Sequence, residues 1–241
     1  MTANLAQCLA WRWPSQCQVC ARWPASRLCA DCLARFAPAR RRCERCAAPR
    51  EADAACPCEA QADASACTAC VAAVDYAFPW DRLMARFKFH GETGWARPFG
   101  ELMRAASGAA ALLGAADALV PVPLTPQRLA ERGHHPPWAL TQALARGGAC
   151  VCLPDALQRL GESPAQHRLG RQQRLHNLRG LFAAPPQQLA RLRGARLLLI
   201  DDVMTTGATL DAAAQALRAA GARRVDALVF ARTPAPHERA A

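Results

Sequence analysis

The fold of this chain is decided by the stretch Leu197-Leu198-Leu199-Ile200-Asp201-Asp202-Val203-Met204-Thr205-Thr206-Gly207-Ala208-Thr209-Leu210. Four large aliphatic residues in a row, without polar alternation, are typical of a strand buried on both faces of a parallel sheet. The run ends on two acids, passes through threonines and a glycine, and leads into an alanine-rich helix expected over residues 210–220. The stretch therefore predicts a strand, a loop and a helix, and with them an α/β fold built on a parallel sheet.

The predicted loop has the chemistry of a phosphate-binding site. Backbone N–H groups at a helix start, a glycine that permits close approach and several hydroxyl groups can together hold a phosphate dianion. Asp201 and Asp202 cannot hold the same phosphate, but they suit sugar hydroxyls or a hydrated Mg²⁺ ion, which prefers oxygen ligands. Phosphate, vicinal hydroxyls and a metal ion in one place describe a phosphorylated ribose. The alternative is an ordinary turn between strand and helix with an acidic edge.

Residues 200–209 resemble the phosphoribosyl pyrophosphate (PRPP) signature of type I phosphoribosyltransferases. The resemblance implies that Asp201 and Asp202 are the catalytic acids, which engage the ribose hydroxyls and the metal ion. It also implies that the 5′-phosphate is held by Thr205, Thr206, Gly207, Ala208 and Thr209.

Cysteine pairs mark the first part of the chain, in which each Cys-x-x-Cys gap lets two thiolates bind one ion and two pairs complete a tetrahedral Zn²⁺ shell. Sequential assignment predicts two structural zinc sites, one formed by Cys17, Cys20, Cys29 and Cys32 and the other by Cys43, Cys46, Cys67 and Cys70. Interleaved pairing is the alternative. Cys8, Cys56 and Cys58 are interpreted as spare thiols, although Cys56 or Cys58 could replace a member of a flanking pair.

The distribution of cysteine predicts the domain boundaries. Eleven of the thirteen cysteines lie at or before Cys70, whereas Cys150 and Cys152 sit in a stretch expected to be a buried strand. The chain of 241 residues has room for a medium-sized domain plus an appendage. We therefore predict a zinc ribbon region at 1–72, a phosphoribosyltransferase-like domain at 73–235 and a flexible tail at 236–241.

Charge and hydropathy limit the classes of protein. Lys+Arg exceeds Asp+Glu by 30 − 19 = 11, and a basic surface attracts nucleic acid or phosphate-rich substrates, although the arginine content also fits a GC-rich genome. No window approaches the roughly 20 apolar residues of a membrane span, and the first residues make a poor signal peptide. We expect a cytoplasmic protein, in which dense cysteine indicates metal ligation before disulfides.

Two arginines follow a short strand expected over 118–124. Thr125 is a typical N-cap and Pro126 suits the first helical position, so a helix is expected to begin here. It carries Arg128 and Arg132 one turn apart. Two guanidinium groups at the carboxyl end of a strand could bind pyrophosphate, because each offers paired donors to phosphate oxygens. Ordinary surface arginines are the alternative.

Other polar residues are candidates for the same site. Lys88 and His90 precede a glycine and face either a ligand or solvent, ahead of a helix expected over 95–113. The aromatic residues around them are expected to form core, and stacking on nucleobases is the alternative. His134 and His135 are adjacent and cannot face one direction on a helix, so we do not expect them to form a metal site.

Residues 163–180 combine arginines, amides and glycine with almost no apolar periodicity. This composition is typical of a mobile lid that closes over an anionic, hydrolysable substrate, and Arg171, Arg174 and Asn177 are its candidate contact residues. A solvated basic segment is the alternative.

The order of these motifs resembles the competence protein F (ComF/GntX) family, in which a double zinc ribbon precedes a type I phosphoribosyltransferase domain. The resemblance runs from the cysteine pairs through Lys88-Phe89-His90-Gly91, Val120–Leu124, Arg132-Gly133 and the PRPP signature to Ala231-Arg232-Thr233. The chain departs from the family at one point, because His134-His135-Pro136-Pro137 stands where Phe-Asn-Gln-Ala is usual.

The resemblance implies a role in natural competence and DNA uptake, and a pentosyl transfer in which an unidentified acceptor nitrogen displaces pyrophosphate from PRPP with Mg²⁺. The alternative is a non-catalytic PRPP-fold protein that binds single-stranded DNA or competence proteins.

Overall fold

The computed structural model describes residues 15–50, 56, 58, 65–146, 150–160 and 180–234. Its contacts divide the chain into two units, residues 1–38 and 39–241. The division falls inside the predicted region 1–72, and the second cluster of cysteines lies in the larger unit.

The smaller unit is built around cysteines. Ser15 and Ala25 form an antiparallel bridge, and helix α2 (Ala30–Phe36) follows. Its buried cluster consists of Cys17, Cys29 and Cys32, with Val19, Ala25 and Phe36 packed against them. So small an apolar cluster is too little to stabilise a fold alone, as expected of a unit that depends on a bound metal.

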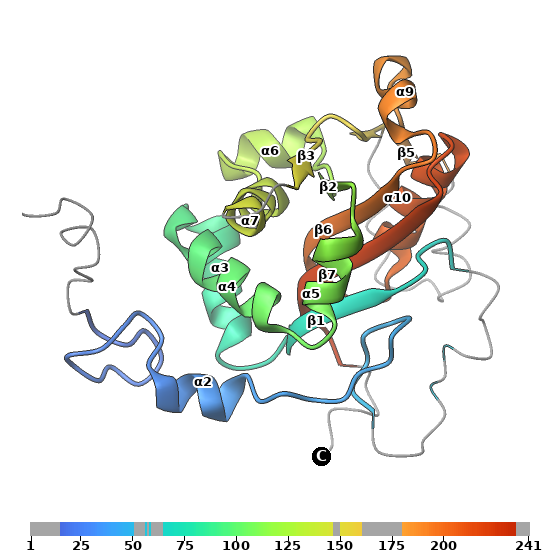
Figure 1. The fold of residues 1–241 in the computed structure, drawn as a ribbon. Helices are drawn as coiled ribbons and strands as arrows, with labels where there is room; N and C mark the ends of the chain where they lie inside the picture. Colours follow the sequence, from blue (N-terminus) through green and yellow to red (C-terminus); the bar gives the residue numbers. More distant parts are fainter. Residues whose placement is uncertain are drawn as a thin grey trace, which may run out of the picture. The chain divides into compact units, whose positions relative to one another are not determined.

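Five parallel strands form the sheet of the larger unit, in the spatial order β1-β7-β6-β2-β3 (Figure 1). Their bounds are Cys70–Asp75 (β1), Ala118–Pro121 (β2), Val151–Cys152 (β3), Arg196–Met204 (β6) and Arg224–Arg232 (β7). Two short strands, Gln158–Arg159 (β4) and Phe182–Ala183 (β5), pair antiparallel with each other. The predicted parallel-sheet α/β fold is confirmed.

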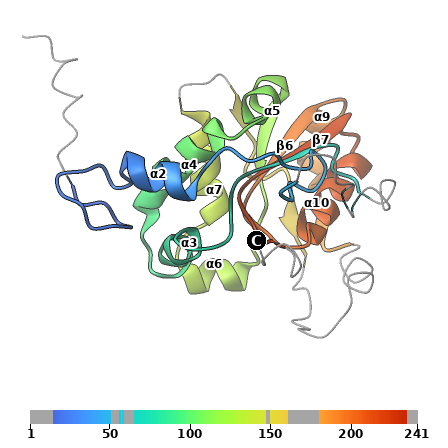
Figure 2. The ribbon, with the colours of Figure 1, turned by 90° about the horizontal axis from the view of Figure 1, so that it is seen from below.

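Helices cover both faces of this sheet. Their bounds are Trp80–Phe89 (α3), Thr93–Trp95 (η2), Ala96–Ala105 (α4), Ala109–Ala115 (α5), Pro126–Arg132 (α6), Pro136–Ala145 (α7), Pro186–Gln188 (η3), Leu189–Leu192 (α9) and Ala208–Ala219 (α10). Figures 1 and 2 show α4 and α7 against one face of the sheet and α10 against the other. A sheet covered on both faces explains the unbroken aliphatic run of β6.

Strand β6 lies in the interior of the sheet, between β2 and β7. Leu197 and Leu199 belong to the core on the α10 side together with Leu217, and Leu198 and Ile200 are fully buried as well. The central position of β6 places the residues that follow its carboxyl end over the middle of the sheet.

The aromatic residues Trp80 and Phe87 of α3 and Phe99 of α4 form core, as expected. The same prediction is wrong for Phe78 and Phe89, which are exposed. Phe99 stacks on Phe230 of β7 with ring centroids 4.1 Å apart, and Trp80 meets the same ring edge-on at 5.8 Å. Phe87 packs edge-on against Phe99 at 5.5 Å. These contacts fix the direction of α3, whose last turn carries Lys88.

Two expected elements differ in the structure. The helix expected over 95–113 is broken between α4 and α5, where Gly108 has a φ of 84° that favours glycine. The strand expected to bury Cys150 and Cys152 is a two-residue edge strand in which Val151 is 53% exposed, so that prediction is wrong. An edge strand has one neighbour, here β2, and leaves the other side uncovered.

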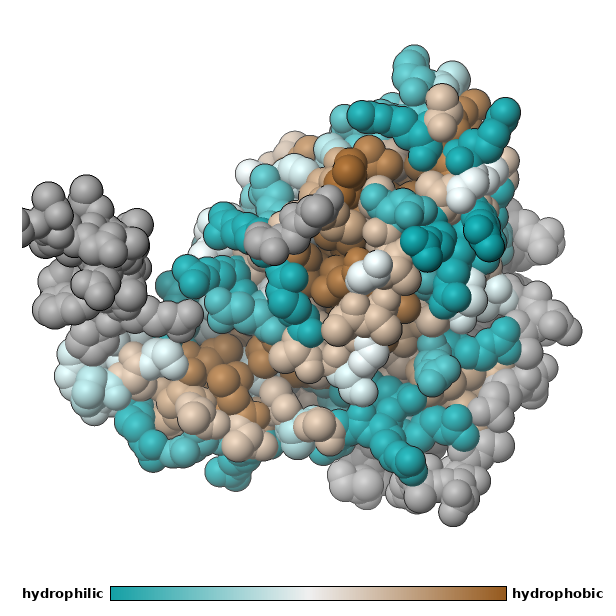
Figure 3. Space-filling view, in the orientation of Figure 1, coloured by the Kyte–Doolittle hydropathy of each residue, from teal (hydrophilic) through white to brown (hydrophobic). Residues whose placement is uncertain are grey.

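The face of the larger unit drawn in Figure 3 mixes charged and apolar residues. Hydrophobic residues gather near its centre, and hydrophilic residues surround them. The exposed Val151 belongs to β3.

Candidate active site

The two acids of the signature lie within β6, near its carboxyl end at Met204. Asp201 is 9% exposed and Asp202 is 5% exposed. Because successive side chains of a strand point to opposite faces, the two carboxylates diverge. The structure therefore has both acids covered, each in its own surroundings.

Asp202 is paired with Lys88, whose Nζ lies 2.6 Å from Oδ1 of the acid. The Lys88 side chain is 15% exposed and that of Asp202 is 8% exposed, so the pair is shielded from solvent. The pair is therefore an ion pair largely screened from water. The ion pair joins the end of α3 to the end of β6, which lie 114 residues apart in sequence (202 − 88).

The surroundings of Asp201 disfavour the charged form of its carboxyl group. Its Oδ1 accepts a hydrogen bond from the backbone N–H of Asp202 at 2.8 Å. Burial, together with the neighbouring Asp202 carboxylate, raises the pKa of Asp201 to about 7 against the opposing effect of Lys88. A carboxyl group whose pKa is raised by burial and a neighbouring acid is a candidate functional residue.

The loop after β6 joins the strand to α10 through a glycine. Gly207 has a φ of 82°, which turns the chain into α10, and Thr206 Oγ1 accepts a weak bond from the N–H of Ala208 at 3.4 Å. Thr205 is exposed, and Thr206 and Thr209 are half-buried. The helix that follows has twelve residues, so its amino end offers free N–H groups and a positive dipole end at the loop.

The arginine helix begins and ends as predicted. Thr125 Oγ1 accepts from the N–H of Arg128 at 3.2 Å, and Gly133, with a φ of 70°, ends the helix. The Arg132 guanidinium lies over the exposed ring of Phe89, 5.0 Å from its centroid. The structure thus brings α6 beside the last turn of α3, where Lys88 was expected to face either a ligand or solvent.

The two histidines that replace the usual residues of the family have separate partners. His135 Nε2 lies 3.2 Å from the carbonyl oxygen of Val122, and because a carbonyl only accepts, this nitrogen carries the proton. Burial lowers the pKa of His135, despite the Val122 bond and the nearby Asp202. His134 Nδ1 contacts the carbonyl oxygen of Arg132 at 3.1 Å. His135 therefore ties the start of α7 to the segment after β2.

Among the described residues, the structure gathers Lys88, Asp202, Arg132 and His135 around the carboxyl end of the sheet. The role of His135 was missed from sequence. A signal for Lys88 existed, because it is the single lysine among 30 basic residues. The predicted lid residues Arg171, Arg174 and Asn177 lie outside the described residues.

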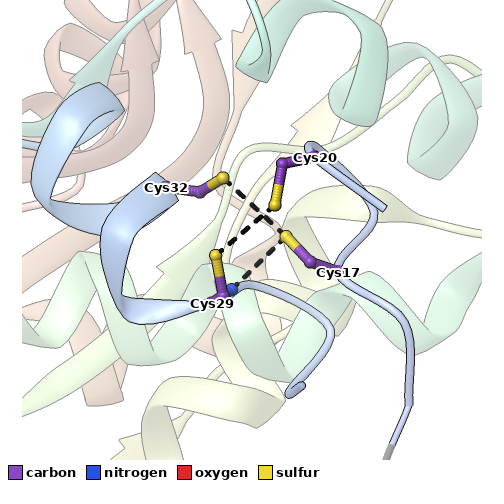
Figure 4. Close-up of side chains that lie close together, drawn as sticks. All are labelled: Cys17, Cys20, Cys29 and Cys32. Atoms are coloured by element: carbon purple, nitrogen blue, oxygen red, sulfur yellow. Dashed lines mark hydrogen bonds between the residues drawn. The ribbon is translucent and has the colours of Figure 1, made fainter. Parts of the chain in front are cut away.

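Cys17, Cys20, Cys29 and Cys32 point toward a common centre (Figure 4). The Cys17 and Cys32 sulfurs are 3.8 Å apart and those of Cys20 and Cys29 are 3.7 Å apart. Tetrahedral Zn²⁺ with Zn–S bonds of about 2.3 Å separates its sulfurs by about 3.8 Å. Although burial acts to raise it, backbone N–H groups lower the pKa of Cys17 to about 6, which favours the thiolate that a metal requires. These residues could hold a metal ion.

The second cysteine group differs from the predicted one. Its members are Cys43, Cys46, Cys56 and Cys58, with the Cys43–Cys58 and Cys46–Cys56 sulfurs each 3.4 Å apart. This group could also hold a metal ion. The interpretation of Cys56 and Cys58 as spare thiols is wrong. Cys56 and Cys58 complete the second group in place of the predicted Cys67 and Cys70.

Cys67 and Cys70, the predicted pair, are core residues of the larger unit. The Cys67 sulfur contacts the carbonyl oxygen of Leu210 at 3.7 Å, and the Cys70 sulfur lies 3.6 Å from that of Met204. Burial raises the pKa of Cys70 to about 12 and that of Cys67 well above its usual range, so both stay protonated. The same two-residue gap here separates two core residues, of which Cys70 is the first residue of β1.

Comparison with known proteins gives matches that agree with this geometry. The family described as "Phosphoribosyl transferase domain" matches residues 161–240. The DNA utilization protein YhgH of Escherichia coli K12 is 30% identical over 170 residues, which are 68% of this chain and 71% of that protein. Competence protein F of Haemophilus influenzae is 29% identical over 160 residues, 65% of this chain and 69% of that protein.

The chain belongs to the competence protein F family. A solved structure titled "Structure of the allosteric regulatory enzyme of purine biosynthesis" is 18% identical and covers 56% of this chain and 25% of its own, with a TM-score of 0.35. That likeness is too weak to bear on function. Every helix in the described part of the chain is too short or too polar to cross a lipid bilayer.

Proposed function

We propose that this competence protein F family member binds PRPP with Mg²⁺ and transfers the phosphoribosyl group to an acceptor nitrogen in the cytoplasm. The observation that supports this most is the continuity of β6, the Thr205–Thr209 loop and α10. A pair of acids at the end of a central parallel strand, followed directly by a helix start, brings a site for sugar oxygens beside a site for phosphate.

The residues divide the substrate among them. The Thr205–Thr209 loop would hold the 5′-phosphate through its amides and hydroxyls, and Arg128 and Arg132 would hold the pyrophosphate. Asp201 and Asp202 would accept hydrogen bonds from the ribose hydroxyls or bind Mg²⁺ as oxygen ligands. Arg171, Arg174 and Asn177 would close over the substrate and exclude water.

Mg²⁺ suits the carboxylates at the end of β6, because carboxylate oxygens are hard ligands and phosphate oxygens of the substrate can complete the shell. When bound, the ion would neutralise charge on the pyrophosphate leaving group. The Lys88 ammonium lies where a cation would approach Asp202, so Lys88 would compensate that acid until the substrate arrives. The raised pKa of Asp201 means that it would give up its proton to bind a cation.

The test is a screen for PRPP consumption across nucleobases and related acceptors, with pyrophosphate release as the readout. Turnover with any acceptor, abolished in Asp202→Asn, supports a transferase. Tight binding of PRPP without release of pyrophosphate in any mixture contradicts the transfer step and leaves a PRPP-binding protein.

The two cysteine groups are proposed to hold structural Zn²⁺. Their four-sulfur donor sets and sulfur separations suit a tetrahedral thiophilic ion, and the unit that contains the first group has little apolar core of its own.

The net charge of the chain and the names of its relatives support a second proposed function. The net charge is +11, and the relatives are named for DNA utilization and competence. The chain would bind single-stranded DNA through its basic surface, alone or with competence proteins, and PRPP would regulate that binding. Phosphate contacts release counterions, so affinity should fall steeply with salt. Arg171→Ala with Arg174→Ala should lower both the affinity and the salt slope, and no change in either contradicts a lid contact with DNA.

A further inference from the structure

Arg232, in the motif Ala231-Arg232-Thr233 at the end of β7, contacts the second cysteine group. Its Nε donates to the carbonyl oxygen of Cys46 at 3.0 Å, and its Nη1 donates to the carbonyl oxygen of Thr233. The side chain is half-buried, so these bonds are partly shielded from water. One guanidinium thus joins the loop that carries Cys43 and Cys46 to the end of a central strand.

The same strand end joins the phosphate loop. Arg232 is in register with Met204 of β6, and the N–H of Thr233 donates to the carbonyl oxygen of Met204 at 2.8 Å. Met204 directly precedes Thr205. A Cβ added to Gly207 would lie 3.7 Å from the Met204 sulfur. Met204 therefore lies between the β7 end and the turn that shapes the loop.

A second connection runs through residues 65–70, which lead into β1. The N–H of Cys70 donates to the carbonyl oxygen of Glu44, inside the second cysteine group, at 2.6 Å. At the other end of this segment, the N–H of Ala66 donates to Asp211 Oδ1 at 2.6 Å. Asp211 is 8% exposed and stands in the first turn of α10. The segment therefore fastens the cysteine group to the helix start on the other side of the phosphate loop.

We infer that the second cysteine group, acting through Arg232 and residues 65–70, holds the Thr205–Thr209 loop in its binding shape. Arg232 is a positioning residue in this arrangement, and a metal ion at the second group binds cooperatively with a phosphate ligand at the loop. The ligand named in the test, PRPP, rests on the proposed function, whereas the mechanical connection does not. The first cysteine group belongs to the unit 1–38 and provides a control of the same chemistry.

The first experiment uses cobalt as a spectroscopic probe for each site. Cys20→Ser leaves the second group intact, and Cys58→Ser leaves the first group intact. Co²⁺ is titrated into each variant with excess Mg²⁺, with and without PRPP, and thiolate-to-cobalt absorption reports its affinity. Coupling is reciprocal, so PRPP should tighten Co²⁺ binding about tenfold in Cys20→Ser and leave Cys58→Ser unchanged. Equal behaviour of the two variants, in a protein that binds PRPP, overturns the inference.

The second experiment needs no PRPP. Hydrogen exchange at the amides of residues 205–211 is compared in wild type, Cys58→Ser, Cys20→Ser, Arg232→Gln and Arg232→Lys. Exchange should rise about tenfold in Cys58→Ser and Arg232→Gln, stay at the wild-type rate in Cys20→Ser, and recover in part in Arg232→Lys, which keeps one donor for Cys46. The amides of β6 serve as an internal reference for global unfolding.

The outcomes separate the two claims. If wild type binds no PRPP but loop exchange still depends on Cys58 and Arg232, the proposed function fails and the connection stands. If loop exchange is the same in all five proteins, the inference is wrong whatever PRPP does.

Discussion

Lys88 and Asp202 form a largely buried ion pair in the candidate site, with Lys88 Nζ 2.6 Å from Asp202 Oδ1. Removing one partner of such a pair leaves a buried charge without compensation, whereas removing both leaves none. The difference between those two cases can be measured.

We predict that Lys88→Met lowers the free energy of unfolding by about 2 kcal/mol, a value reduced from that of a fully buried pair because the lysine is partly exposed. The double variant Lys88→Met with Asp202→Asn should lose clearly less than the sum of the single variants. Urea unfolding of the four proteins completes the cycle. Additive losses would show that the two side chains do not interact.

Asp201 should make stability depend on pH in the direction opposite to that of an ordinary paired acid. Its pKa is about 7 in the folded protein against an ordinary value of 3.8, so the folded state keeps a proton that the unfolded state has lost between these values. Stability from this group is present below about pH 4 and is lost as the pH rises to about 7. Relative to Asp201→Asn, wild type should lose stability from pH 5 to pH 7 in urea unfolding. A constant difference over that range refutes the assignment.

At this scale the sequence predicted the identity of the acids but not their partners. The motif singles out Asp201 and Asp202 as candidate site residues. The pairing of Asp202 with Lys88 depends on how α3 packs through Phe87 and Phe99. The histidine at 135 drew attention as a departure, and only the fold shows that it bonds the Val122 carbonyl.

Helices α4 and α7 approach each other at a glycine. A Cβ on Gly100 would lie 2.8 Å from the Cβ of Ala143, closer than real contacts allow, whereas a Cβ on Gly114 of α5 would meet nothing within 4 Å. The two positions form a matched pair of helical glycines with opposite surroundings.

Gly100→Ala should destabilise the protein by about 1–3 kcal/mol, because the clash outweighs the gain in helix propensity. Gly114→Ala should stabilise it by up to about 1 kcal/mol, since only propensity changes. Thermal unfolding of both variants checks the pair. A stabilised Gly100→Ala would mean that the helices are further apart than described.

The cysteine groups give a prediction about metal content. Purified wild-type protein should carry about two zinc ions by elemental analysis, and Cys56→Ser should carry about one. Cys70→Ala should keep about two while lowering stability, because it removes a buried side chain beside Met204 and no ligand. Loss of an ion in Cys70→Ala, with none lost in Cys56→Ser, would restore the sequential pairing.

Helices and strands were predicted correctly where the hydrophobic pattern was long, and incorrectly where contacts with other segments determine the structure. The strand and helix around the signature follow from four aliphatics and a glycine turn. Three features depend on contacts between segments that are distant in sequence, and local residue spacing carries no information about such contacts. They are the break at Gly108, the exposed edge strand β3 and the set of cysteines that forms the second group.

The whole molecule combines an acid-and-phosphate site with a strongly basic composition. The boundary expected at residue 72 reflected cysteine density, whereas the contacts divide the chain after residue 38, because the second cysteine group is bonded to β1 and β7. A group so connected is part of the larger unit. The charge of +11 favours anionic ligands of either size, so charge alone does not choose between PRPP and DNA.

The most direct test is a calorimetric titration of PRPP into wild type, Asp202→Asn and Asp117→Asn, with and without Mg²⁺. Asp117 is an exposed carboxylate paired with Arg196 at the opposite end of β6 and serves as the control. We predict Mg²⁺-dependent binding to wild type and Asp117→Asn, and affinity at least about tenfold weaker in Asp202→Asn, as expected from the loss of one charge-assisted contact. Equal affinity of all three proteins, or no binding by wild type, would contradict the account.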